Sequence, residues 1–265
     1  MSEIGSPGIL THGGAGAPSR WSDGCHRAAE AGMAALEHGA SAIEAVVKAT
    51  VILEDDPRFN AGTGCVLRDD GKTIEADAGL MDSNARIGAV SALNGVKNPI
   101  LVAEKILETR HILLSGHGAA VFAETHGLKN GNPPTGRAIA AFEGEPCDTV
   151  GAVARDKNGL FASASSTGGI RSAMVGRVGD SPLPGCGFWA GPLGAVTATG
   201  LGEQIAKKLL CRTVYGYLES GVPAEEACKQ GVALYPREVS IGVLVITPGA
   251  YGWASNRDMA HAILP

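Results

Sequence analysis

The order of helix-like and strand-like segments most constrains what this chain can fold into. One short strand at residues 8–12 is followed by two successive helices, at 22–39 with Ser22 as N-cap and at 41–51 with Ser41 as N-cap. A doubly wound parallel sheet would place single helices between its strands. Helices in pairs favour two mainly antiparallel sheets packed face to face and covered by helices, so we predict an α+β fold.

The later segments repeat this order, with strands preceding helices in each half of the chain. Residues 127–148 have the composition of a linker and separate the two halves. The elements expected on either side are strands within 64–83 (with an Asp-Gly turn) and 86–95, helices at 98–109 and 117–126, a hairpin turning at 156–159, a strand near 193–198, helices at 202–218 and 223–235, and a closing hairpin at 241–255.

Composition and charge exclude several classes of protein. The 265 residues carry a net charge of −5 with scattered Lys and Arg, which argues against a nucleic-acid or anionic-membrane partner. Apolar runs fall short of the roughly 18 residues that a membrane-spanning helix needs. The N-terminus has no basic n-region and no apolar h-region, so we expect no secretory signal. Six cysteines without a CxxC pair are expected as reduced thiols. We therefore predict a cytoplasmic protein of one large or two small domains.

The chemistry-bearing residues that remain are threonines. The sequence has no GxSxG, its histidines show no metal-ligand spacing, and segment 198–206 lacks the third glycine of a dinucleotide loop. Thr149 stands where the linker enters a strand, and Thr167 stands at the far end of the returning strand. A threonine hydroxyl needs an adjacent base to become a nucleophile, and the α-amine of an N-terminal threonine can be that base. The alternative for each threonine is an ordinary β-branched strand residue.

Six motifs occur in order along nearly the whole chain: HGGAGA at 12–17, LEDDPRFNAGTG at 53–64, DTVGAVA at 148–154, SSTGG at 165–169, GRVGDSPLPGCG at 176–187 and TATGLGE at 197–203. Together they resemble the plant-type L-asparaginase and isoaspartyl peptidase family of N-terminal-nucleophile hydrolases. The resemblance implies a four-layer αββα sandwich formed by a single domain, 1–265. It also implies self-cleavage between Asp148 and Thr149 into an alpha subunit, 1–148, and a beta subunit, 149–265, which assemble as a dimer of heterodimers.

The resemblance also implies the activity and the residues that carry it. The substrates would be L-asparagine, hydrolysed to L-aspartate and ammonia, and β-aspartyl (isoaspartyl) dipeptides, with no cofactor for catalysis. The implied roles are Thr149 as nucleophile, Thr167 orienting its hydroxyl, Asn60 beside it, Thr199 and the N–H of Gly200 as the oxyanion hole, Arg177 and Asp180 holding the substrate α-carboxylate and α-ammonium, and Gly202 as a backbone contact.

A structural sodium ion is implied as well, bound by backbone carbonyls of the loop that leaves the second helix. Neutral carbonyl oxygens suit a hard cation. The residues concerned are Leu53, Glu54, Asp56, Phe59, Ala61 and Thr63. Without the resemblance, this loop would be an ordinary helix exit, Arg177 and Asp180 a surface i,i+3 ion pair, and Gly202 a helix-start glycine.

Other activities stay open alongside the leading one. They are a glycosylasparaginase, which removes a sugar amine from asparagine, a taspase-like protease, and a non-catalytic binder that never cleaves itself. Asp180 within RVGDSP favours a free amino-acid head group over a protein substrate. The chain departs from the family pattern at Ala173, where many relatives carry lysine, and in the C-terminal segment YPREVSIGVLV.

Overall fold

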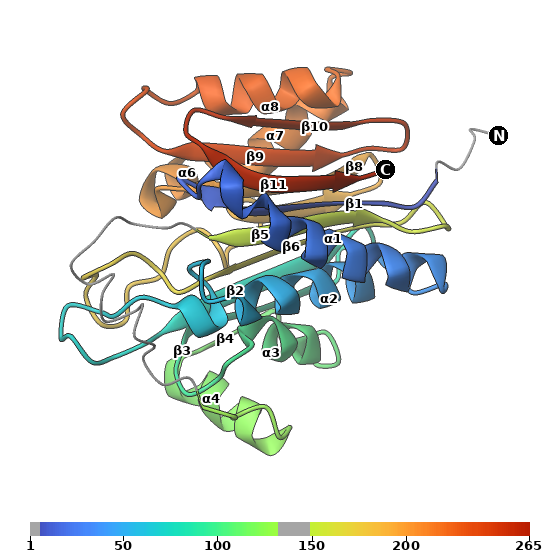
Figure 1. Cartoon of the computed structure of the whole chain (residues 1–265). Coiled ribbons are helices and arrows are strands. Elements are labelled where there is room, and N and C mark those ends of the chain that lie inside the picture. Colours follow the sequence, from blue (N-terminus) through green and yellow to red (C-terminus); the bar gives the residue numbers. More distant parts are fainter. Residues whose placement is uncertain (1–5, 132–148) are drawn as a thin grey trace.

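Two sheets form the centre of the fold (Figure 1). The computed structural model describes residues 6–131 and 149–265, and within them the larger sheet has the order β11-β1-β5-β6-β2-β3-β4 and the smaller β10-β9-β8-β7. Neighbouring strands are antiparallel, apart from the parallel pair β3 and β4. The strands are β1 (Gly8–Ala15), β2 (Ala76–Asp82), β3 (Ile87–Leu93), β4 (Leu113–Ser115), β5 (Val150–Arg155), β6 (Phe161–Thr167), β7 (Phe188–Gly191), β8 (Gly194–Gly200), β9 (Ile241–Ile246), β10 (Tyr251–Ser255) and β11 (Met259–Leu264).

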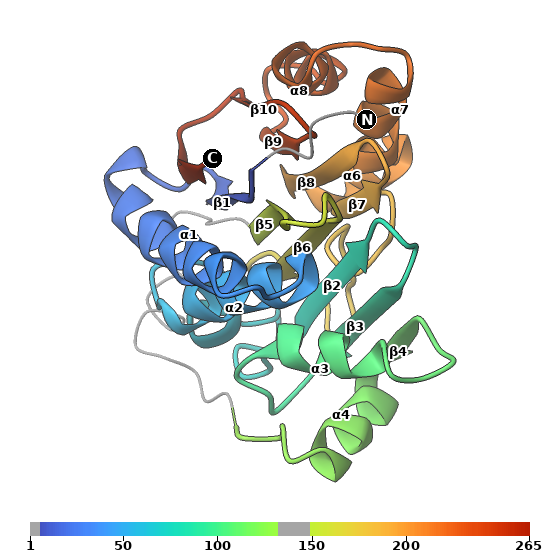
Figure 2. The ribbon, with the colours of Figure 1, turned by 90° about the vertical axis from the view of Figure 1, so that its right-hand side faces the viewer.

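The helices lie on the outer faces of these sheets (Figures 1 and 2). On the larger sheet, α1 packs on β1 and β11, α2 on β5 and β6, and α3 on β2 and β3, while α7 and α8 cover the smaller sheet. The inner faces meet where β5 contacts β8 and β6 contacts β7. This arrangement confirms the predicted α+β class. The helices are α1 (Ser22–Glu37), α2 (Ala42–Asp55), α3 (Pro99–Ile106), α4 (Gly116–Thr125), α6 (Gly202–Lys208), α7 (Leu210–Glu219) and α8 (Ala224–Ala233), with short 3₁₀ turns η1 (Ser19–Trp21) and η2 (Gly62–Gly64).

Strand β1 shows how one strand serves two hydrophobic cores. Successive side chains of a strand point to opposite faces of the sheet. Ile9 therefore belongs to the cluster under the helices, together with Val46 of α2. Leu10 belongs to the cluster between the sheets, together with Phe188 and Leu244. Because both faces are covered, all eight residues of β1 are buried, and the strand lacks the polar alternation of a surface strand.

The predicted helix caps and boundaries are confirmed in part. Ser41 caps α2 through a capping box, in which its hydroxyl accepts from the Glu44 N–H and the Glu44 carboxylate accepts from the Ser41 N–H. The prediction for Ser22 is wrong, because Ser22 lies inside α1 and Trp21 is the N-cap. The single helix predicted at 202–218 is also wrong: the backbone turns left-handed at Leu209, with φ 46°, and separates α6 from α7.

Two strand predictions also differ from the structure. Residues 65–75, expected to begin a strand pair, form a loop closed by the hydrogen bond from the Arg68 N–H to the Thr73 carbonyl. The final strand, β11, was not predicted, and it pairs with β1 rather than with the hairpin before it. The predicted hairpin at 156–159 is confirmed, with β5 and β6 joined there and Gly159 at φ 75°.

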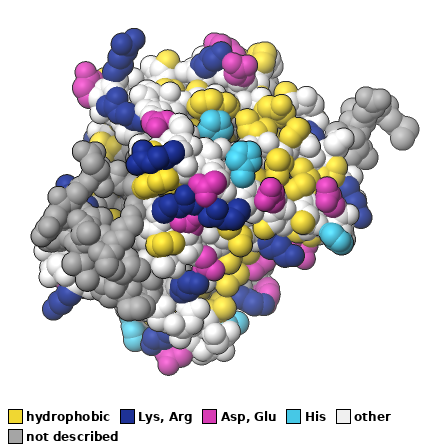
Figure 3. All heavy atoms as spheres, in the orientation of Figure 1, with side chains coloured by type: hydrophobic (Ala, Val, Ile, Leu, Met, Phe, Trp, Pro, Cys, Tyr) yellow, Lys and Arg dark blue, Asp and Glu magenta, His cyan; other side chains and the backbone are white. Residues whose placement is uncertain are grey.

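The surface over α1 and α2 carries charges of both signs side by side, as the face in Figure 3 shows. On these helices, Arg27 and Asp23 form an ion pair at 2.7 Å, and Arg58 joins Asp23 at 2.7 Å and Asp56 at 2.6 Å. These contacts fasten the loop after α2 to α1.

Among the described residues, no helix is long and apolar enough to cross a membrane. The five cysteines in that part of the chain are free and buried, and Cys147 lies outside it.

Candidate active site

The two predicted threonines face each other at the open end of the β5–β6 hairpin. In this antiparallel pair Val150 lies opposite Ser166, so the next step along both strands places Thr149 opposite Thr167. Residues directly opposite share a face of the sheet. Both side chains are 4% exposed. The hairpin therefore brings together two hydroxyls that are 18 residues apart in the sequence. Asp148, the predicted partner in the cleaved bond, lies outside the described residues.

A serine that the sequence analysis did not single out reaches the Thr149 hydroxyl. The Oγ atom of Ser181 lies 3.4 Å from Thr149 Oγ1, and either hydroxyl can donate. Ser181 is fully buried and directly follows Asp180. Its position beside a predicted substrate-binding aspartate was the only signal in the sequence, and the contact with Thr149 depends on the packing of a distant loop.

Thr199, on β8 of the facing sheet, contacts the backbone of Thr149. Its hydroxyl donates to the Thr149 carbonyl at 3.3 Å and accepts from the Ala15 N–H at 3.2 Å. The next residue, Gly200, has φ 140° and lies against the carbonyl of Ser240, so the backbone there leaves no room for a side chain. Thr199 and Gly200 thus end β8 beside the start of β5.

The predicted substrate anchors come together at the start of α6. A Cβ atom placed on Gly202 would lie 2.8 Å from Asp180 Oδ1 and 2.9 Å from Arg177 Nη2, so a side chain at this position would displace both groups. The Arg177 guanidinium donates from Nε and Nη2 to the two Glu203 carboxylate oxygens, both at 2.8 Å. These hydrogen bonds lower the pKa of Glu203. The ion pair in the structure is therefore between Arg177 and Glu203, rather than the i,i+3 pair with Asp180.

Asn60 lies against the glycines that follow Thr167. Its side-chain amide donates to the Gly169 carbonyl at 2.6 Å, and its backbone carbonyl accepts from the Gly168 N–H at 2.9 Å. The Gly169 N–H in turn donates to Thr167 Oγ1 at 3.1 Å. Asn60 thereby fixes the turn in which the second threonine ends its strand.

Two buried titratable groups flank the threonines. His12, opposite Gly151 on β5, is fully buried, and burial together with the nearby His261 lowers its pKa to about 3. The imidazole is therefore neutral at physiological pH. Asp77 lies on β2 opposite Thr167, and burial raises its pKa to about 6. The hydrogen bond that Asp77 accepts from the Ala92 N–H lowers the pKa, but the effect of burial is larger.

The loop after α2 has the donor chemistry predicted for a sodium site. A Cβ atom on Gly62 would lie 2.5 Å from the Glu54 carbonyl oxygen and 2.7 Å from the Lys97 carbonyl oxygen, so two neutral oxygens lie close to the Gly62 backbone. Within the described chain, the buried hydroxyl of Thr63 has no hydrogen-bond partner. The carbonyls of Leu53, Asp56 and Ala61 each accept one backbone N–H, which leaves each a second lone pair. The residues present therefore fit a hard monovalent cation.

Comparisons with known proteins place this arrangement in context. Residues 5–145 and 136–263 match the family model described as asparaginase. An isoaspartyl peptidase/L-asparaginase of Homo sapiens is 39% identical over 95% of this chain and 90% of its own length. The protein of the same name from Danio rerio is 38% identical, over 94% and 88%. A plant-type L-asparaginase of Pyrococcus horikoshii is 35% identical, over 97% and 95%.

Proposed function

The chain belongs to the asparaginase family, and from this premise we propose that it hydrolyses the side-chain amide of L-asparagine and the β-linked bond of isoaspartyl dipeptides. One observation carries the proposal: Ser181, which contacts the Thr149 hydroxyl, directly follows Asp180, which lies with Arg177 around Gly202. The reacting hydroxyl and the predicted head-group anchors thus belong to one continuous site. Both substrates share the aspartyl end, and they differ in the amine that leaves.

The proposed reaction begins with self-cleavage of the bond before Thr149. The Thr149 hydroxyl attacks the Asp148 carbonyl, and the acyl group moves from nitrogen to oxygen, which frees the threonine α-amine. Water then hydrolyses the ester, which restores the hydroxyl and leaves Asp148 with a terminal carboxylate. In the processed enzyme, the same hydroxyl attacks the substrate side-chain carbonyl and passes its proton to that amine. The leaving amine departs protonated, and water releases L-aspartate from the β-aspartyl ester. Thr199 and the Gly200 N–H would stabilise the negative charge on the carbonyl oxygen.

Arg177 and Asp180 would select the head group by charge. Of the five N–H donors of a guanidinium, Glu203 takes two, and the remaining three can bind the α-carboxylate of the substrate. Asp180, 3% exposed, would accept from the α-ammonium group. A substrate that lacks either charge would leave Arg177 or Asp180 without its partner in a buried site, which is costly, so we expect a much lower kcat/KM for such substrates.

A substrate panel tests this proposal directly. Processed enzyme should release aspartate from L-asparagine and from a β-aspartyl dipeptide, and it should leave N-acetyl-L-asparagine intact because that compound has no α-ammonium group. Turnover is measured as aspartate released per enzyme. Hydrolysis confined to N4-(N-acetylglucosaminyl)-L-asparagine would identify a glycosylasparaginase. Binding of L-aspartate without turnover of any substrate would identify the non-catalytic alternative.

The proposal extends to the architecture and the assembly. We take the helices α1–α3, the two sheets, and the helices α7–α8 as the layers of an αββα N-terminal-nucleophile hydrolase sandwich, because the inner faces of the sheets contact each other. For the assembly we propose a dimer of cleaved heterodimers. Light scattering of the processed protein tests it, and a mass equal to a single copy of the chain would contradict it.

A bound sodium ion in the loop after α2 is proposed to stabilise the fold. Binding to the folded state alone adds about 1.4 kcal/mol for each tenfold rise in ion concentration above the dissociation constant. For a chain of this size that corresponds to a rise in Tm of ~3–6 °C. We expect Tm to rise from choline chloride to sodium chloride at constant ionic strength. Equal Tm values in the two salts would argue against the site.

A further inference from the structure

Arg68 is a fully buried arginine that the functional residues above do not include. It lies in the loop 65–75, between η2 and β2, and its side chain is 0% exposed. A buried guanidinium is costly unless its donors are paired. Arg68 Nε donates to Glu75 Oε2 at 3.1 Å, and Nη2 donates to the Glu75 carbonyl at 3.1 Å. The chain therefore maintains an ion pair inside the protein, close to the candidate active site.

This pair holds the backbone that carries Arg177. Arg68 Nη2 also donates to the Arg177 carbonyl at 3.3 Å, and Glu75 Oε2 accepts from the Gly176 N–H at 2.7 Å. The neighbouring residue, Asp69, donates its N–H to the carbonyl of Ala173 at 2.9 Å. Residues 170–177 belong to no strand in the described structure, so no strand partner holds them in place. The contacts with Arg68, Asp69 and Glu75 hold the backbone next to Arg177 instead.

On its other side, Arg68 lies against the turn that follows Thr167. Gly169 has φ 79°, and a Cβ atom placed there would collide with Arg68 Nη1, so the guanidinium fills the space beside the Gly169 backbone. Gly169 is the residue whose N–H donates to Thr167 Oγ1. One rigid, planar group thus separates the backbone at the second threonine from the backbone at the proposed carboxylate anchor.

We propose that Arg68, together with Glu75, is a positioning residue that sets the distance between the catalytic threonines and Arg177. The inference rests on the proposed function. Arg68 acts through the Arg177 backbone, so it determines how well the α-carboxylate of the substrate is held rather than how the hydroxyl attacks. A lysine cannot replace it, because a single ammonium group lacks the planar fork that bonds two carbonyls and a carboxylate together.

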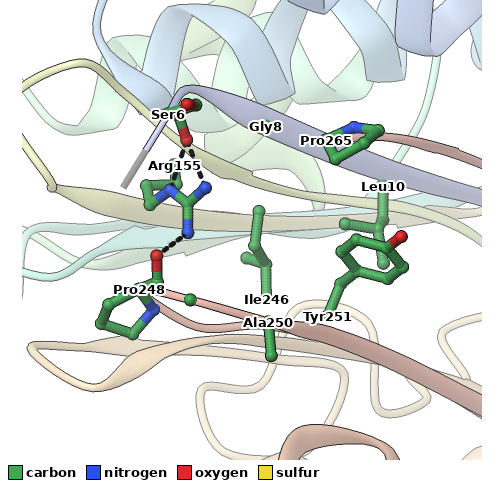
Figure 4. Close-up of a pocket in the computed structure, with 10 residues that line it drawn as sticks. Ser6, Gly8, Leu10, Arg155, Ile246, Pro248, Ala250, Tyr251 and Pro265 are labelled. Carbon is green, nitrogen blue, oxygen red and sulfur yellow. Dashed lines mark hydrogen bonds between the residues drawn. The ribbon is translucent and has the colours of Figure 1, made fainter. Parts of the chain in front are cut away.

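The test compares Arg68→Lys, Arg68→Met and Glu75→Gln in the full chain, with Arg155→Met as the matched control. Arg155 is also largely buried, at 8% exposure, and it donates to the carbonyls of Ser6, Thr247 and Pro248. It lies at the other end of β5, in the lining of a hollow of about 420 Å³ (Figure 4). Its loss should lower Tm without touching the substrate site.

For each variant, intact mass gives the processed fraction and steady-state kinetics give KM and kcat for L-asparagine and for L-asparaginamide, which lacks the α-carboxylate. Misplacing a binding group by about 1 Å can cost on the order of 10²-fold. We expect KM for L-asparagine to rise by about tenfold or more in the Arg68 variants, with kcat changed less than about threefold. The preference for L-asparagine over L-asparaginamide should fall by the same factor. The Arg155→Met variant should keep the wild-type KM and the wild-type preference.

Either of two results would overturn the inference: an unchanged preference in processed Arg68 variants, or the same loss of preference in Arg155→Met. If Arg68→Met does not fold, the substrate preference of Glu75→Gln provides the test. This variant keeps the side-chain volume and removes the charge that pairs with Arg68. A wild-type enzyme inactive on every substrate would instead refute the proposed function, so the two failures are distinguishable.

Discussion

Replacing Thr149 with alanine is expected to leave a single uncleaved chain of 26.9 kDa and to lower asparagine hydrolysis on the order of 10⁶-fold. The alanine lacks the hydroxyl that the proposed mechanism uses twice, first for self-cleavage and then for attack on the substrate. The loss should be larger than for any other substitution, since the neighbouring Ser181 hydroxyl lacks the α-amine that activates an N-terminal threonine. Intact mass under denaturing conditions and aspartate release measure the two effects.

The matched variants separate chemistry from folding. Thr149→Ser keeps a hydroxyl and should still cleave, though more slowly. Thr50→Ala removes a buried threonine whose hydroxyl donates only to the Val46 carbonyl inside α2, at 2.7 Å, and it should cleave as the wild type does. Two fragments from Thr149→Ala, or cleavage at a different bond in the wild type, would show that another residue is the nucleophile.

Arg177→Met is expected to lower kcat/KM for L-asparagine by about 10²- to 10³-fold, chiefly through KM. Removing one member of a buried, hydrogen-bonded charge pair costs roughly 2–5 kcal/mol, and the substrate α-carboxylate would lose its charged partner. Arg177→Lys should recover little of the loss, because a lysine cannot keep both the Glu203 contact and the substrate contact. Self-cleavage should persist in both variants, since no free substrate takes part in it.

The control for this prediction is an exposed arginine with an ion pair of its own. Arg86 is 57% exposed and pairs with Asp82 at 2.7 Å, so Arg86→Met should change kcat/KM less than about twofold. Initial rates over a range of L-asparagine concentrations measure the effect. A kcat/KM for Arg177→Met within threefold of the wild type would place the carboxylate site elsewhere.

The features that the sequence predicted correctly depend on residues close together in the chain. The capping box at Ser41 and the hairpin turn at 156–159 each involve a few consecutive positions, so their signals are complete within a short window. The opposition of Thr149 and Thr167 follows from that same hairpin once its turn is known. Local patterns therefore predicted the part of the site that one hairpin builds.

The features that the sequence did not reveal depend on distant partners. Strand β11 exists because β1, at the other end of the chain, offers it an edge. Leu209 takes a left-handed conformation inside an apparently continuous helical pattern, where only tertiary packing can offset the cost of φ 46°. Ser181 and Arg68 meet the active site through loops, and loop residues carry no periodicity that would indicate what they contact.

The strand order of the larger sheet determines what a cut before Thr149 would leave behind. Across the sheet from the β11 edge to the β4 edge, β11 belongs to the C-terminal piece and β1 to the N-terminal piece. Next, β5 and β6 belong to the C-terminal piece, and β2, β3 and β4 belong to the N-terminal piece. The two pieces are interleaved, and every boundary between them is a ladder of backbone hydrogen bonds. Processing would thus turn one chain into two without creating two domains. Neither product could leave without unzipping the sheet, so the new amino terminus would stay anchored in the strand that presents it.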